Sequence, residues 1–134
     1  DQRELRFVPR VLPALRGSVL RITNSDELRH NAHHEGQPDG FDLVFGPGDS
    51  EEIPLESSGV IEVRCHFHSS MVAWVVVVET PWFSMTDAEG VFEIEGIPPG
   101  EYQLSMWHER LAEETVTVRV RSGEVTEVEF LPED

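Results

Sequence analysis

The sequence has one cysteine, few basic residues (none of them lysine) and no long apolar run. These shortages limit the class of protein that the chain can belong to. A single cysteine, Cys65, rules out an internal disulfide. All 10 basic residues are arginines, set against 26 acidic residues, so the formal net charge is −16. Such an acidic protein is repelled by nucleic acid and anionic lipid and attracts basic protein partners. No stretch reaches the roughly 18 apolar residues that a membrane-spanning helix needs.

Other chemistries are excluded because their ligands or loops are missing. There is no glycine-rich loop to bind phosphate. A dinuclear copper centre with paired cysteines needs two of them, and a histidine brace needs an N-terminal histidine where the given chain has Asp1. Structural zinc prefers more thiolates or imidazoles. The given chain shows no signal peptide, which is compatible with Asp1 being the start of a mature or trimmed chain.

The residues that are present alternate in the manner of β-strands. With 39% hydrophobic residues the chain can bury a core. Glycine- and proline-rich turn signals such as Pro98-Pro99-Gly100 separate the alternating stretches. Residues 109–114 alone could form a short helical turn. Many short strands at regular spacing predict an all-β antiparallel sandwich or barrel. The alternating stretches are residues 20–22, 61–65, 92–95, 102–106 and 116–120.

One stretch breaks the alternation, because residues 72–78 (VAWVVVV) are apolar on both faces. Leaving one face in water would forfeit about 25 cal/mol for each Å² of apolar surface and would invite aggregation. We therefore expect residues 82–134, read as a meander of about four strands, to pack against this strand.

Soft and borderline metal donors gather in IEVRCHFHSSMVAW, residues 61–74. Cys65, His68 and Met71 span a predicted strand–loop–strand connection, which can fold three donors around one point. A second imidazole is available in NSDELRHN, residues 24–31, which follows another predicted strand. Two imidazoles, one thiolate and a weak axial thioether form the site typical of blue copper in electron transfer.

These motifs resemble the cupredoxins, the family of plastocyanin and amicyanin, whose members pair an N-x-D…H-N segment with a C-x-x-H loop followed by methionine. The two-residue gap between His68 and Met71 matches the short amicyanin-type loop. The resemblance covers roughly residues 5–81. It implies a Greek-key copper-binding domain over residues 1–81 that holds one copper ion (Cu⁺/Cu²⁺) per chain.

Carried over by position, the resemblance implies the metal ligands His30, Cys65, His68 and Met71. Asn31 takes the place of the asparagine that joins the two ligand loops by hydrogen bonds. This chain departs from many relatives in two respects. Only 34 residues separate His30 from Cys65, and a histidine stands at position 66.

Downstream, TDAEGVFEIEGIPPGEYQLSMWHERL resembles the carboxypeptidase-regulatory-like, prealbumin-type β module. The resemblance implies a β extension over residues 82–134 that packs against the sandwich. The combination is similar to bacterial exported plastocyanin-like proteins labelled methylamine-utilisation proteins, which implies a periplasmic or otherwise exported location. That label does not show that the chain acts on methylamine.

Four further histidines are candidates for auxiliary metal binding. His66 is expected to be exposed, since the strand pleat turns it away from Cys65. Its alternative role is to bind a neighbouring copper, as in multicopper oxidases, but such centres need several more paired histidines. His33 and His34 are expected in a solvated loop, with capture of incoming copper as the alternative. His108 is expected on the strand face of residues 102–106, where core packing or a hydrogen-bonded role is favoured over metal binding.

The expected function is that of a one-electron carrier rather than an enzyme, because protein ligands fill the site and leave no position open for substrate. Its acidic surface would attract a basic redox partner, more weakly as salt rises. Copper delivery or tolerance, with His33, His34 and His66 recruiting the ion, is the alternative. A third hypothesis is an enzyme with a second copper bound by His66 and His108 at a subunit interface.

Overall fold

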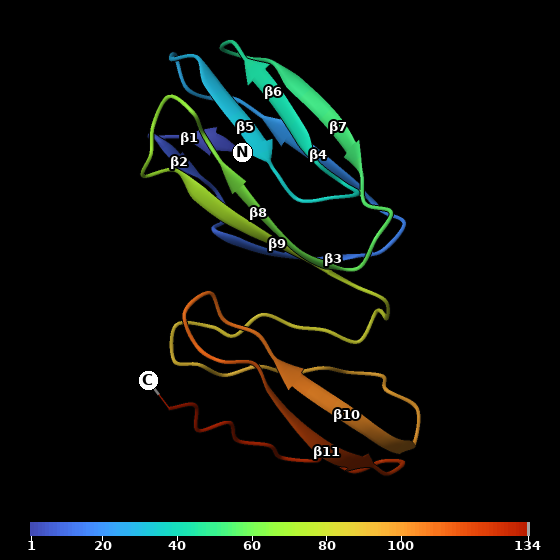
Figure 1. The fold of residues 1–134 in the computed structure, drawn as a ribbon. Helices are drawn as coiled ribbons and strands as arrows, with labels where there is room; N and C mark the ends of the chain where they lie inside the picture. The colour runs from blue at the N-terminus through green and yellow to red at the C-terminus, as the bar shows by residue number, and fades with distance from the viewer. Residues whose placement is uncertain (134) are drawn as a thin grey trace.

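The computed structural model describes residues 1–133, and all of its regular structure is β (Figure 1). Within that range no helix is long and apolar enough to cross a membrane. The strands are β1 (Gln2–Arg3), β2 (Arg6–Phe7), β3 (Val11–Leu15), β4 (Val19–Thr23), β5 (His30–His34), β6 (Phe41–Phe45), β7 (Ser50–Pro54), β8 (Gly59–Arg64), β9 (Val72–Val78), β10 (Gly100–Met106) and β11 (Glu114–Val120).

Two sheets form a sandwich, which comprises β3 to β9. The larger sheet has five strands in the order β3-β9-β8-β5-β6, in which β3 runs parallel to β9 and the other pairs are antiparallel. The smaller sheet pairs β4 with β7. The short β1–β2 hairpin lies beside one end of these sheets (Figure 1). The all-β prediction is therefore confirmed.

The core lies between the two sheets, where the inward residues of each strand meet. On β4, Leu20 and Ile22 are buried while Arg21 between them is exposed. The same period buries Ile61 and Val63 on β8, so alternation of side chains sets the inner face of each strand. The fully buried members include Phe45 and Ala32, at 0% exposure.

On the outer face of β9, Trp74 lies beside the C-terminal module, by which we mean residues 82–133. On this strand Ala73, Val75 and Val77 point into the core, whereas Trp74, Val76 and Val78 are half-buried. The ring of Trp107 lies 6.4 Å from that of Trp74 between centroids. The guanidinium of Arg10 lies 5.1 Å from the centre of the Trp74 ring. It also forms a two-point ion pair with Glu109 at 2.8 and 2.9 Å.

The module has fewer strands than the sequence predicts. Only β10 and β11 pair, in an antiparallel hairpin with Tyr102 opposite Val118. Residues 92–95 alternate as expected but lie in irregular chain, and residues 109–114 form no helical turn. Gly90 and Gly96, with φ of 79° and 73°, bend the chain at both ends of the alternating stretch. No residue between 79 and 133 is buried, so the module has no closed core of its own.

Candidate metal centre

Two connections at one end of the sandwich carry the predicted metal donors. β8 ends at Arg64, and Cys65 follows it into the loop with only 5% of its surface exposed. The loop closes where the N–H of Met71 donates to the carbonyl of His68 over 3.0 Å. His30 is the first residue of β5 and is 0% exposed. Strand ends thus bring donors that are distant in sequence to one place.

Three of these donors converge on one point. The Nδ1 atoms of His30 and His68 lie 3.2 Å apart, and the Sγ of Cys65 lies 3.8 Å from Nδ1 of His68. All three ligand atoms are within 4.8 Å of one another, and no other such cluster of His, Cys, Asp or Glu is found in residues 1–133. An ion about 2.0 Å from each nitrogen and about 2.3 Å from sulfur needs donor separations of roughly 3.3–3.8 Å. The spacing therefore suits one metal ion.

Met71 lies at the end of the same loop. It is 1% exposed and belongs to the buried cluster that includes Cys65. A buried thiol, two imidazoles and a thioether at the end of the same loop are soft or borderline donors, a set that suits copper better than a hard cation. The residues present fit that metal.

Asn31 connects the two ligand segments. Its backbone N–H donates to Sγ of Cys65 over 3.4 Å. Its side-chain Oδ1 accepts from the backbone N–H of His66 at 3.1 Å, and its Nδ2 donates to the carbonyl of Leu43 at 3.0 Å. Nδ2 also donates to Asp42 at 2.6 Å, and this hydrogen bond holds the pKa of Asp42 below its ordinary value. The amide thus joins β5, β6 and the cysteine loop.

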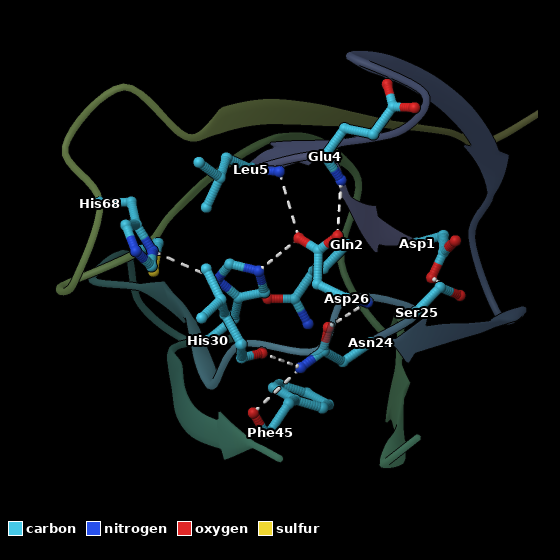
Figure 2. A network of polar contacts seen from close by, with 12 residues as sticks. Asp1, Gln2, Glu4, Leu5, Asn24, Ser25, Asp26, His30, Phe45 and His68 are labelled. Atoms are coloured by element: carbon cyan, nitrogen blue, oxygen red, sulfur yellow. Dashed lines mark hydrogen bonds and ion pairs between the residues drawn. The ribbon is translucent and has the colours of Figure 1, made fainter. Parts of the chain in front are cut away.

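Asp26 is a contact residue that the sequence reasoning did not single out. Its Oδ2 accepts from Nε2 of His30 over 2.7 Å, as Figure 2 shows. This hydrogen bond is the main reason that the pKa of Asp26 is lowered, with smaller contributions from the N–H groups of Leu5 and Glu4. Because a carboxylate oxygen accepts, this contact calls for the donor on Nε2, and a ring in that tautomer directs the lone pair of Nδ1 to the cluster. The sequence does place Asp26 four positions before His30, in DELRH. The two side chains come into contact only when the loop is folded.

The auxiliary histidines lie outside the three-donor cluster. His33 and His34 are in β5 and partly buried, so the expectation of a solvated loop was wrong. His33 stacks on His66 with ring centroids 3.6 Å apart and planes 3° from parallel. Stacked rings direct their in-plane lone pairs side by side, which is poor geometry for binding one ion. His108 lies beyond the end of β10 and is exposed, so the expectation of core packing on that strand face was wrong. Its Nδ1 accepts from the N–H of Arg110, which is a hydrogen-bonded role.

The two-sheet β-sandwich, with a His–Cys–His cluster formed at one end by the first residue of β5 and the loop after β8, has the cupredoxin fold. A solved structure of a reduced amicyanin variant matches this chain with a TM-score of 0.53 at 16% identity, covering 56% of this chain and 75% of that one. Another reduced amicyanin variant matches at 20% identity with a TM-score of 0.52.

A Cu-containing nitrite reductase from Thermus scotoductus SA-01 is also similar. It matches at 26% identity with a TM-score of 0.53, over 57% of this chain and 21% of that one. Neither a family model nor a curated protein matches the sequence itself. The likeness to solved structures therefore concerns the fold of a little more than half of the chain.

Proposed function

We propose that this chain is a mononuclear copper protein of the cell envelope that carries one electron between larger redox proteins. The observation that supports this most directly is the convergence of Cys65 Sγ with the Nδ1 atoms of His30 and His68. We assign Met71 as the weak fourth ligand, because it is buried and ends the loop that carries Cys65 and His68. Copper held there would supply the Cu(II)/Cu(I) couple.

The protein's part is to hold the ligands still. Asp26 orients His30, the N–H of Asn31 contacts Cys65, and the short loop to Met71 is closed by its own hydrogen bond. Ligands fixed by separate contacts need little rearrangement when charge changes, which favours fast electron transfer over catalysis. With every ligand position assigned to a side chain, no position is left for substrate.

The exposed edge of the site is its contact with a partner. His68 is partly exposed, whereas the other three assigned ligands are buried. A net charge of −16 favours a redox partner with a basic surface and makes association weaken as salt rises.

Absorption and electron paramagnetic resonance spectra of the copper-loaded protein test the proposal. We expect an intense sulfur-to-copper charge-transfer band in the visible range. Cys65→Ser should abolish the band while the far-UV circular dichroism spectrum of the β fold is retained, because a hydroxyl is a poor ligand for a soft metal. A band that survives the substitution would overturn the ligand assignment.

A second measurement separates electron transfer from copper delivery. Reversible cycling of the coloured site with retained metal supports the carrier. Rapid loss of copper to an apo-acceptor protein, without redox cycling, would favour delivery or tolerance instead. The stacked arrangement of His33 and His66 gives no ready second site for an incoming ion, which favours the carrier.

A further inference from the structure

The turn between β1 and β2 has an unusual backbone. Glu4 and Leu5 have φ of 52° and 58°, and both lie in the left-handed region that favours glycine. The pairing of Gln2 with Phe7 and Arg3 with Arg6 leaves these two residues as the whole loop. A two-residue loop with positive φ at both positions normally selects asparagine and glycine. Glutamate and leucine here mean that surrounding contacts hold the turn in a strained form.

Those contacts come from a single carboxylate. The N–H of Glu4 donates to Oδ1 of Asp26 at 2.6 Å, and the N–H of Leu5 donates to Oδ2 at 3.1 Å. Two successive backbone N–H groups in this conformation form a concave site for an anion. The same Oδ2 accepts from Nε2 of His30, so the turn and the ligand share one carboxylate (Figure 2).

The rest of the loop is fixed around this carboxylate. The backbone N–H of Asp26 donates to Oδ1 of buried Asn24 at 3.0 Å. Nδ2 of Asn24 contacts three carbonyl groups at 2.9–3.2 Å. The N–H of Ser25 donates to the carbonyl of Gln2, which ties the loop back to the hairpin. The side chain of Asp26 is only 15% exposed, so water competes little for its oxygens.

We propose that the β1–β2 turn is a positioning element for the metal centre: its two N–H groups hold Asp26, and Asp26 fixes the ring and tautomer of His30. The proposal rests on the proposed function as far as copper is concerned, but its first consequence concerns the metal-free protein. A carboxylate that accepts from the far nitrogen of a ligating histidine makes that ligand more basic. It therefore favours the more highly charged, oxidised ion and lowers the reduction potential.

Asp26→Asn is the test. It keeps the shape of the side chain but removes its negative charge. Its NH₂ group is a donor, which would face an N–H of the turn or of His30 instead of accepting from it. In the metal-free protein, ¹⁵N NMR of the imidazoles should show His30 as a single tautomer protonated at Nε2, and a tautomer mixture in the variant. In the copper-loaded protein the variant should bind copper about 10–100-fold more weakly and show a higher reduction potential.

Two control variants separate this role from simpler ones. Glu27→Gln removes one exposed charge from the neighbouring residue and should leave the tautomer, affinity and potential unchanged. Leu5→Gly keeps its N–H, relieves the strain at φ 58° and should raise the thermal midpoint with the same potential as the parent.

The outcomes distinguish the positioning role of Asp26 from the proposed copper function. A changed tautomer in Asp26→Asn without any blue copper in the parent would sink the proposed function and leave the positioning role standing. Blue copper in both proteins with the same affinity, potential and tautomer would overturn the positioning role. A potential that shifts equally in Glu27→Gln would also overturn it, because net charge alone would then explain the effect.

Discussion

The backbone N–H of Asn31 donates to Sγ of Cys65 over 3.4 Å, which joins the start of β5 to the loop after β8. The thiolate is the form of cysteine that binds metal, and this N–H is directed at its sulfur. The side chain of Asn31 extends the same link to the N–H of His66. One residue therefore sets the relative position of two ligand segments.

Replacing this side chain should loosen the site and the fold together. Asn31→Ala removes the buried side-chain amide, so the N–H of His66 and the carbonyl of Leu43 lose their hydrogen-bond partner. We expect a loss of about 2–4 kcal/mol in the free energy of unfolding. Urea titration of the metal-free protein measures it. His33→Ala removes only one contact of the same amide, at 2.8 Å, and should cost under about 1.5 kcal/mol. Equal losses in the two variants would contradict the linking role.

Met71→Leu should keep copper bound but raise the reduction potential. Met71 is 1% exposed and leucine has a similar volume, so the core should lose less than about 1.5 kcal/mol. Removing a weak axial donor destabilises Cu(II) relative to Cu(I). Voltammetry of the two copper-loaded proteins gives the shift. An unchanged potential would show that Met71 is not the axial ligand.

The Arg10–Glu109 ion pair predicts a pH-dependent stability. The hydrogen bond from Arg10 is the main cause of the lowered pKa of Glu109, with the charge of Arg10 adding to it. A lowered pKa means that the contribution is present above the ordinary value of 4.5 and is lost as pH falls through the folded-state value.

We therefore expect Glu109→Gln to be less stable than the parent by up to about 1 kcal/mol at pH 7, with the gap closing below pH 4.5. Urea unfolding at pH 7 and at pH 3.5–4 measures both. Glu113→Gln, at an exposed neighbour, should show no gap at either pH. A gap that is independent of pH would mean that the ion pair is not its cause.

Side-chain alternation predicted which face of a strand is buried, but not which strand lies beside it. Leu20 and Ile22 alternate with the polar Arg21 in the sequence, and both are buried. Residues 92–95 alternate equally well yet lie in no strand, because a ladder also needs a partner at the right distance. His108 was placed on a strand face, but β10 ends two residues earlier. Local pattern cannot fix where pairing stops.

The candidate site was likewise predictable only in part. The spacing of Cys65, His68 and Met71 within one loop was visible in the sequence, since a short loop keeps its donors together. The contact of Asp26 with the β1–β2 turn was not visible in the sequence. It is made by the backbone N–H groups of Glu4 and Leu5, which lie 22 and 21 positions before Asp26. Backbone donors have no sequence signature.

The outer face of β9 supplies the last prediction, that the chain cut after Pro81 will not behave as a soluble short domain. β9 lies between β3 and β8, so both its edges are paired and only its faces can change. Its inner row is in the core, and its outer row is half-buried with the module present. Removing the module uncovers Trp74 and deprives Arg10 of its partner Glu109.

A newly exposed apolar strip on a flat sheet face promotes association between molecules. We expect residues 1–81 to aggregate or to bind a hydrophobic dye strongly, as measured by size-exclusion chromatography with light scattering and by dye fluorescence. Trp107→Ala in the whole chain is the matched control. It removes the ring that lies 6.4 Å from that of Trp74 but keeps the covering chain, so it should give a milder form of the same behaviour. A monomeric, soluble, copper-loaded fragment of residues 1–81 would show that the sandwich does not depend on the module to cover β9.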